Sequence, residues 1–255
     1  MILAIDVGNS NIVLGCIEGR EILHFIRLRT DARETEAEYV IKMSQLLEFY
    51  KLDLKKIEGV ILSSVVPPVT EALTRAFRTM FGKDPMVVGP GMKTGLNIKI
   101  DDPGTVAADL IVGSVAALNE YGAPAIVIDL GTAMTMIVLD KDNAFRGGVI
   151  YPGIKLSYAA LASGTSLLPE ISIQAPGKVV GSNTVDCMRS GAVYGTAALI
   201  DGMVERMEEE FGYPMKVVAT GGLANGVVQH CRREIIYDGD LLMKGLRILY
   251  EKNKK

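Results

Sequence analysis

Polar residues with the spacing of a phosphate-binding turn lie near the start of the chain. Asp6 ends an apolar run, residues 8–11 are Gly-Asn-Ser-Asn, and a second apolar run begins at Ile12. Two short apolar runs around a Gly/Asn turn predict a β-hairpin, in which the glycine permits a positive φ and close approach of a ligand. The amide and hydroxyl donors of this turn could point at a phosphate, and Asp6 could hold a hydrated cation. An ordinary acidic turn is the alternative.

The same arrangement returns in the second half of the chain. An apolar run ends at Asp129, residues 130–132 are Leu-Gly-Thr, and another apolar run follows. Aligning the two acids pairs the residues that follow them, Gly8 with Gly131, Asn9 with Thr132 and Ile12 with Thr135. A duplicated domain with one phosphate-binding hairpin in each half explains the repeat, and chance similarity is the alternative. The familiar G-x-x-x-x-G-K-[ST] and G-x-G-x-x-G loops are absent, and a strand pattern, not a helix, follows the first turn.

Composition limits the kinds of protein that this chain can be. Of its 255 residues 49% are hydrophobic and 22% charged, which predicts a large core. A net charge of -3 without a basic block argues against a nucleic-acid surface. Three cysteines without C-x-x-C spacing predict reduced core thiols. Because the start does not resemble a signal peptide and no apolar segment reaches membrane-spanning length, we expect a soluble, cytoplasmic protein.

The remaining pattern predicts the elements that position these turns. After the first hairpin we expect strands at 22–28, 60–66 and 86–88, helices at 31–50, 69–81 and 106–121, and a polar connection at 89–103. After the second we expect strands at 143–149, 216–220 and 235–237, an extended segment at 171–177, and helices at 154–162, near 167, at 183–210 with glycine interruptions, just after 220, and at 241–252. This α/β order predicts a mixed sheet flanked by helices in each half, 1–119 and 120–255, around a shared cleft.

The chain resembles the type III pantothenate kinases, which share the actin-like ATPase superfamily with acetate kinases, sugar kinases and heat-shock ATPases. The motifs that carry this resemblance are 6–11 (DVGNSN), 129–132 (DLGT), 147–148 with 152–153 (GG, PG), 181–184 (GSNT), 220–222 (TGG) and 240–246 (DLLMKGL). The resemblance implies duplicated ribonuclease-H-like domains and transfer of the ATP γ-phosphoryl group to pantothenate, the first step of coenzyme A synthesis. It also implies Mg²⁺, a monovalent cation (K⁺ or NH₄⁺) and a homodimer, with no nucleic-acid or membrane partner expected.

The resemblance also implies roles for individual residues. The nucleotide would contact Asp6, Val7, Gly8, Asn9, Ser10, Asn11, Ile12, Val13, Thr132, Gly221 and Gly222. Pantothenate would contact Ile100, Ala107, Ala108, Asp109, Leu110 and Thr184. Asp109 would accept the proton of the substrate hydroxyl, and Asp129 would bind the monovalent cation.

Each of these roles has a structural alternative. Asp129 could cap its own turn, and Asp109 could serve only as an acid in the first turn of a helix. Thr184 could simply open a helix capped by Asn183. The glycines after Thr220 could form an ordinary strand-to-helix turn.

Two positions depart from the family pattern. Where the family commonly has Gly-Ala-Asp-Arg preceded by a Tyr, this chain has residues 107–110 as Ala-Ala-Asp-Leu and Ile100 in place of the aromatic residue. Leu110 lacks the planar cation that could bind the pantothenate carboxylate or orient the acid. A regulatory relative with the same fold, such as a transcriptional accessory protein, and a kinase with another small acceptor are therefore the alternatives to a pantothenate kinase.

Overall fold

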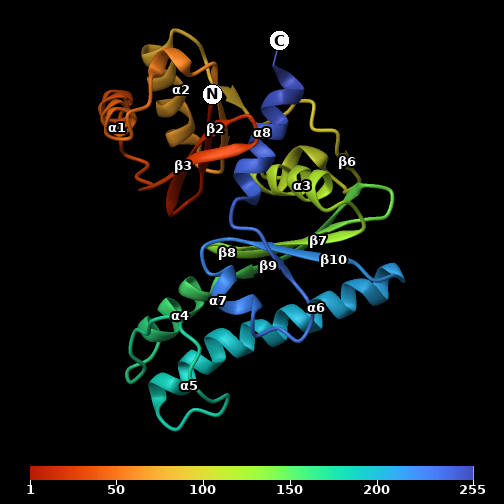
Figure 1. The fold of residues 1–255 in the computed structure, drawn as a ribbon. Coiled ribbons are helices and arrows are strands. Elements are labelled where there is room, and N and C mark those ends of the chain that lie inside the picture. The colour runs from red at the N-terminus through yellow and green to blue at the C-terminus, as the bar shows by residue number, and fades with distance from the viewer. Residues whose placement is uncertain (255) are drawn as a thin grey trace. The chain divides into compact units, whose positions relative to one another are not determined.

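A computed structural model describes residues 1–254, which form two compact units. Unit 1 comprises Met1–Gly95, Asp102–Ala116 and the C-terminal segment from Leu241. Unit 2 comprises Leu96–Asp101 and Ala117–Asp240. Each unit contains one mixed sheet flanked by helices (Figure 1). The units therefore differ from the expected halves, 1–119 and 120–255, because the last helix packs with the first sheet and a short early segment pairs with the second.

Unit 1 is built on a five-stranded sheet in the order β3-β2-β1-β4-β5. Its strands are β1 (Ile2–Val7), β2 (Asn11–Glu18), β3 (Glu21–Arg29), β4 (Gly59–Ser64) and β5 (Met86–Val87). The first three strands are antiparallel neighbours, whereas β4 runs parallel to β1 and to β5. This arrangement brings the end of β3 beside the turn that joins β1 to β2.

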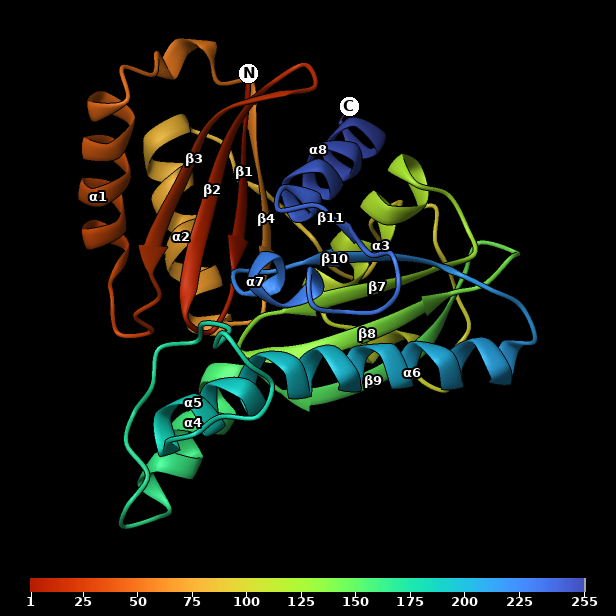
Figure 2. The ribbon, with the colours of Figure 1, turned by 60° about the horizontal axis from the view of Figure 1, so that its bottom comes forward.

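Helices cover both faces of the unit 1 sheet. They are α1 (Glu36–Phe49), α2 (Pro67–Phe81), the start of α3 (Ala108–Glu120) and α8 (Leu241–Asn253), with 3-10 turns at Leu54–Lys56 and Pro103–Thr105. Figure 2 shows α1 and α2 on one side of the sheet and α8 on the other. Alternate residues of β1, among them Leu3 and Ile5, pack in one core with α1 and α2. On the opposite face a Cβ at Gly15 would lie 2.7 Å from Met243 Sδ, so the absence of a side chain lets α8 approach the sheet closely.

Unit 2 contains a six-stranded sheet in the order β11-β10-β7-β8-β9-β6. Its strands are β6 (Asn97–Ile98), β7 (Ala125–Leu130), β8 (Ala133–Leu139), β9 (Ala144–Pro152), β10 (Lys216–Thr220) and β11 (Ile236–Tyr237). Its helices are α4 (Ile154–Ser163), α5 (Thr184–Ser190), a π-helical turn (Gly191–Gly195), α6 (Thr196–Phe211) and α7 (Ala224–Val228). Three antiparallel strands followed by two parallel ones give the same order as in unit 1, which confirms the predicted duplication.

Some local predictions were wrong. The helix expected near Leu167 does not form. Residues 164–183 have neither helical nor strand structure, and the exposed Leu167 side chain gains no core packing that would favour a helix. The expected polar connection contains β6, whose two residues are too few to show a periodic pattern. The first helix begins at Glu36 and not at residue 31, because Thr35 and Glu38 form a capping box. Among residues 1–254, no helix combines the length and the apolar character that a membrane span requires.

Candidate functional site

The first polar turn joins β1 to β2 in unit 1, as predicted. Gly8 N–H donates to the Asn11 carbonyl oxygen at 2.9 Å, so this amide closes the turn. Gly8 does not have the positive φ that we expected. A Cβ there would meet only the Asn11 oxygen at 3.4 Å, an ordinary contact. The backbone conformation at this position therefore does not require glycine, and the missing side chain instead leaves room beside the turn.

Thr30, which follows β3, braces this turn. Its Oγ1 donates to the Gly8 carbonyl oxygen at 2.7 Å, and its N–H donates to the Ser10 carbonyl oxygen at 3.1 Å. Thr30 is not among the site residues expected from the sequence. A signal was present, because the end of the third strand of an antiparallel meander must lie beside the first turn.

The second polar turn joins β7 to β8 in unit 2 and is braced in an equivalent way. Gly131 N–H donates to the Ala133 carbonyl oxygen at 3.1 Å, and Gly153 N–H donates to the Thr132 carbonyl oxygen at 2.9 Å. Gly153 follows β9, the third strand of its sheet, just as Thr30 follows β3. A Cβ at Gly153 would collide with the carbonyl oxygens of Gly131 and Thr132, which explains the glycine of the Pro-Gly motif.

The two turns differ by one residue in length. Asp6 pairs with Val13 across the first hairpin, whereas Asp129 pairs with Thr135 across the second. The structural counterpart of Thr135 is therefore Val13, and the predicted equivalence with Ile12 was wrong. An extra residue in the first turn shifts the alignment beyond the glycine, and the sequence repeat alone did not show this shift.

The structure brings Asp129 and Gly221 together in unit 2. Thr220, at the end of β10, pairs with Asp129, at the end of β7. Gly221 has a φ of +101°, and a Cβ there would lie 2.5 Å from Asp129 Oδ1 and 2.7 Å from the Leu130 backbone. Only glycine fits this turn without strain. Two motifs that lie far apart in the sequence therefore form one corner of unit 2.

Asp109 lies in the first turn of α3, in the part of this helix that belongs to unit 1. Its Oδ1 accepts a hydrogen bond from Leu110 N–H at 2.8 Å. The residue is half-buried, as are Ala107, Ala108 and Leu110. Burial raises the pKa of the Asp109 carboxyl above its usual value, and the hydrogen bond only partly opposes this effect. A carboxylate with a raised pKa has the basicity that a proton acceptor needs.

The other two predicted substrate contacts, Ile100 and Thr184, belong to unit 2. Ile100 lies beside Gly147, since a Cβ at that glycine would be 3.5 Å from Ile100 Cγ2. Asn183 caps α5 by accepting from Asp186 N–H at 2.9 Å, as the structural alternative required. Thr184 is the exposed first residue of the helix and takes no part in this cap.

The described residues offer no ready-made site for a bare metal ion. No group of three or more His, Cys, Asp and Glu side chains in residues 1–254 could hold one. A single acid precedes each turn, Asp6 in unit 1 and Asp129 in unit 2, so neither could by itself supply a full set of metal ligands. His24 packs against the ring of Tyr50, and His230 packs against the ring of Tyr194.

The duplicated topology, with a braced turn in each unit, defines a duplicated actin-like α/β fold. Solved structures support this class. The activator of 2-hydroxyisocaproyl-CoA dehydratase from Clostridium difficile, which contains bound ADPNP, is 14% identical, with 99% of this chain and 96% of that chain covered and a TM-score of 0.58. The inorganic polyphosphate/ATP-glucomannokinase from Arthrobacter sp. strain KM is also 14% identical, with 97% and 96% covered and a TM-score of 0.51.

Sequence comparison identifies the family within this class. The family model described as type III pantothenate kinase matches residues 2–206. The type III pantothenate kinase of Halalkalibacterium halodurans is 45% identical over 253 residues, which cover 99% of this chain and 100% of the relative. The chain belongs to the type III pantothenate kinase family and is an ATP-dependent kinase that uses a divalent metal ion.

Proposed function

We propose that this protein transfers the γ-phosphoryl group of ATP to the primary hydroxyl of pantothenate. The observation that carries the proposal is the pair of acid-preceded turns, each braced by the end of a third strand. Phosphoryl transfer requires charge neutralisation, alignment of the attacking and leaving oxygens, and acceptance of the hydroxyl proton. A rigid turn in each unit suits the first two requirements.

Each turn would bind phosphate groups of the nucleotide. Since the Gly8 and Gly131 amides close their own turns, donors from Asn9, Ser10, Asn11 and Thr132 would bind the phosphates. Asp6 would hold the hydrated Mg²⁺, which when bound neutralises phosphate charge. Residues Val7, Ile12 and Val13 would shape the hairpin beneath the nucleotide. Gly221 and Gly222 would admit the flat base and ribose.

Asp109 would accept the proton of the substrate hydroxyl and hold that oxygen in line for attack. Its raised pKa favours this role over that of a helix-terminal acid, because favourable interaction with the helix dipole alone would lower the pKa. Alignment of the hydroxyl would lower the activation barrier in addition to the basicity of Asp109, since orientation lowers the barrier by up to roughly 7–11 kcal/mol in well-aligned reactions.

Asp129 would bind the monovalent cation, K⁺ or NH₄⁺. Its oxygen donors suit such an ion. A Cβ at Gly221 would lie 2.5 Å from Asp129 Oδ1, so the carboxylate lies directly beside the turn proposed for adenosine. Stimulation of turnover by potassium would follow.

The residues expected to contact pantothenate are Ile100, Ala107, Ala108, Asp109, Leu110 and Thr184. Leu110 and Ile100 offer apolar contacts where the family commonly has Arg and Tyr. The aliphatic part of pantothenate suits apolar contacts, whereas its carboxylate needs a donor from elsewhere, for which the exposed Thr184 hydroxyl is the candidate.

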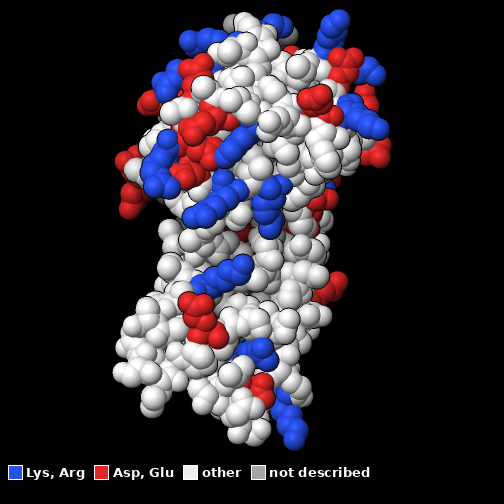
Figure 3. Space-filling model, turned by 90° about the vertical axis from the view of Figure 1, so that its left-hand side faces the viewer, with Lys and Arg blue, Asp and Glu red and all other residues white. Residues whose placement is uncertain are grey.

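The protein would act as a homodimer that associates through an apolar face of unit 2. Large apolar side chains are exposed on α4 and the segment that follows it: Leu156 (52% exposed), Leu161 (40%), Leu167 (90%), Val179 (64%) and Val180 (85%). Figure 3 shows few charged side chains over this part of unit 2, in contrast to the mixed charges over unit 1. Exposed apolar residues in such number are typical of an interface.

A coupled assay of ADP formation with pantothenate, with and without potassium, tests the proposal. We expect pantothenate-dependent turnover that rises with potassium. ATP binding without turnover would favour a regulatory protein, and turnover only with another small hydroxyl or carboxylate acceptor would favour a different kinase. Either result would reject pantothenate as the acceptor.

A further inference from the structure

Two arginines on the edge strand β3 lie on the same face of the unit 1 sheet as Asp6. Val13 pairs with Asp6 on one side and with Arg27 on the other, and Asn11 pairs with Arg29. Residues that are directly paired point to the same face of a sheet. The face that carries the acid and the polar turn therefore also carries two guanidinium groups.

The opposite face of the same strands is apolar. Leu14 and Ile26, which alternate with these positions, pack in the core with α1 and α2. Arg27 and Arg29 thus point away from that core, and both are exposed. The alternation fixes their direction, because a shift of one residue in register would bury both charges.

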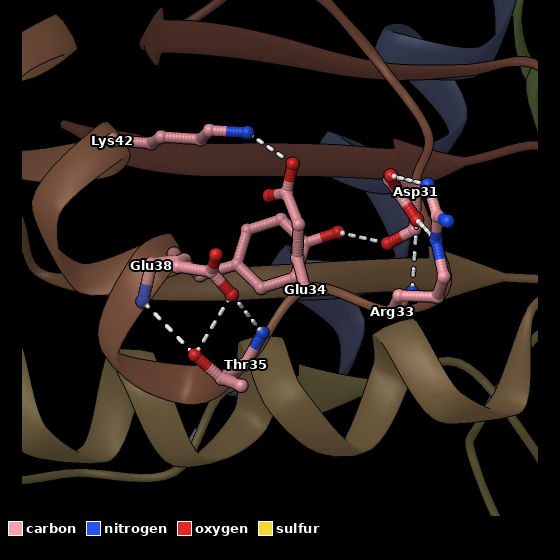
Figure 4. Close-up of polar contacts among 7 residues, drawn as sticks. Asp31, Arg33, Glu34, Thr35, Glu38 and Lys42 are labelled. Atoms are coloured by element: carbon pink, nitrogen blue, oxygen red, sulfur yellow. Dashed lines mark hydrogen bonds and ion pairs between the residues drawn. The ribbon is translucent and has the colours of Figure 1, made fainter.

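Over residues 1–254, the side chains of Arg27 and Arg29 form no hydrogen bond or ion pair, although Arg29 is close enough to Asp31 for a weak attraction that helps to lower the pKa of that carboxyl. The nearby Asp31 carboxylate is occupied by Arg33, whose Nε and Nη2 donate to it at 3.1 and 3.0 Å (Figure 4). These hydrogen bonds hold the pKa of Asp31 at about 2, so this acid stays ionised and paired.

The backbone that follows Arg29 is fixed close to the turn. Thr30 hydrogen-bonds to Gly8 and Ser10, and the capping box of Thr35 and Glu38 anchors the following helix (Figure 4). Arg27 lies two strands from Asp6, or about 10 Å at the usual strand spacing. A ligand above the turn would lie within reach of both arginines.

We propose that Arg27 and Arg29 bind the phosphate groups of the nucleotide held by the first turn. An arginine fork matches phosphate oxygens with two parallel hydrogen bonds. Asp6, Val13 and Arg27 are neighbours across β1, β2 and β3. Because Asp6 is negative and Val13 is uncharged, only β3 supplies positive charge among these three positions. The proposal rests on the proposed function only in placing the nucleotide at this turn, and it adds two residues to the binding site.

The test is equilibrium binding of Mg-ATPγS and of adenosine to the full-length protein, measured by calorimetry. The variants are Arg27→Gln, Arg29→Gln and the double variant, and Arg20→Gln is the matched control. Arg20 is exposed in the β2–β3 turn, at the far end of both strands from Gly8. We expect each single substitution to weaken Mg-ATPγS binding about tenfold and the double variant more. Adenosine affinity should stay constant, and Arg20→Gln should match the unsubstituted protein.

Several outcomes would overturn the proposal. Unchanged Mg-ATPγS affinity in the double variant, or equal losses for adenosine and Mg-ATPγS, would exclude phosphate contacts. In steady-state kinetics of the same variants, a rise in the pantothenate KM with no change in the KM for ATP would show that the arginines bind the acceptor substrate instead. The binding measurement does not depend on turnover. If the protein binds Mg-ATPγS but does not phosphorylate pantothenate, the proposed function is rejected, whereas the dissociation constants of the variants still decide this inference.

Discussion

The proposed role of Asp109 as proton acceptor carries an energetic cost, and the two effects can be separated by pH. Burial raises its pKa in the folded state, so the folded protein binds the proton more tightly than the unfolded chain does. Above the folded-state pKa the folded protein carries the full cost of the buried charge. Below the ordinary carboxyl pKa, about 3.9, both states are protonated and the cost disappears.

We therefore predict that Asp109→Asn lowers kcat by about 10²-fold or more and raises Tm at pH 7. Loss of the proton acceptor explains the first effect, and removal of a buried charge explains the second. In a protein of this size about 1 kcal/mol corresponds to about 2–4 °C. The Tm difference should shrink as pH falls through the folded-state pKa. An active variant, or one that melts lower at pH 7, would contradict this account.

Gly8 and Gly221 differ in the reason why each position lacks a side chain. Gly8→Ala should leave Tm within about 2 °C, because the added Cβ makes only an ordinary contact, yet it should weaken Mg-ATP binding roughly 10- to 100-fold by displacing the phosphates. Thermal melting and nucleotide titration measure the two effects. Unchanged nucleotide affinity would show that the ligand does not approach this turn.

Gly221→Ala should instead destabilise the protein. Its φ of +101° is strained for alanine, and the Cβ would meet Asp129 Oδ1 and the Leu130 backbone. We expect a loss of about 1–3 kcal/mol in the free energy of unfolding, measured by denaturant titration. Gly226→Ala, where no atom lies within 4 Å of the added Cβ, is the control. Equal stability of the two variants would be inconsistent with the observed packing.

At the level of elements, the third strand of each sheet acts as a brace for the turn between the first two. Thr30→Val keeps the shape of the side chain and removes the 2.7 Å hydrogen bond to the Gly8 oxygen. We predict a stability loss of about 0.5–1.5 kcal/mol and a rise of about tenfold in the KM for ATP, with the pantothenate KM unchanged. Thr30→Ser should restore ATP affinity. Steady-state kinetics of both variants decide the matter, and wild-type behaviour of Thr30→Val would show that the brace is dispensable.

For the whole molecule, association through the apolar face of unit 2 can be tested directly. Leu167→Asp and Val180→Asp place a charge on that face, and we predict that each converts the dimer to a monomer in sedimentation analysis. Phe49→Asp is the matched control, because Phe49 is 78% exposed on α1 in unit 1 and lies outside that face. A monomeric wild-type protein, or dimers of all three variants, would remove the proposed interface.

The sequence by itself determined the duplicated α/β fold and most of its elements. Period-2 and helical patterns, together with turn residues, are local signals, and they located both hairpins, the acids that precede them and Asp109 in the first turn of α3. The family motifs added the class of reaction. Short or aperiodic segments such as β6 and the stretch around Leu167 were missed because they lack a local signal.

Only the tertiary structure decided which distant residues meet. Sheet pairing places Arg27 beside Val13 and Thr220 beside Asp129, and neither pair follows from local propensity. The same pairing showed that the two turns differ by one residue. Register is set by the simultaneous packing of whole strands against their helices, a non-local condition that no short stretch of sequence contains.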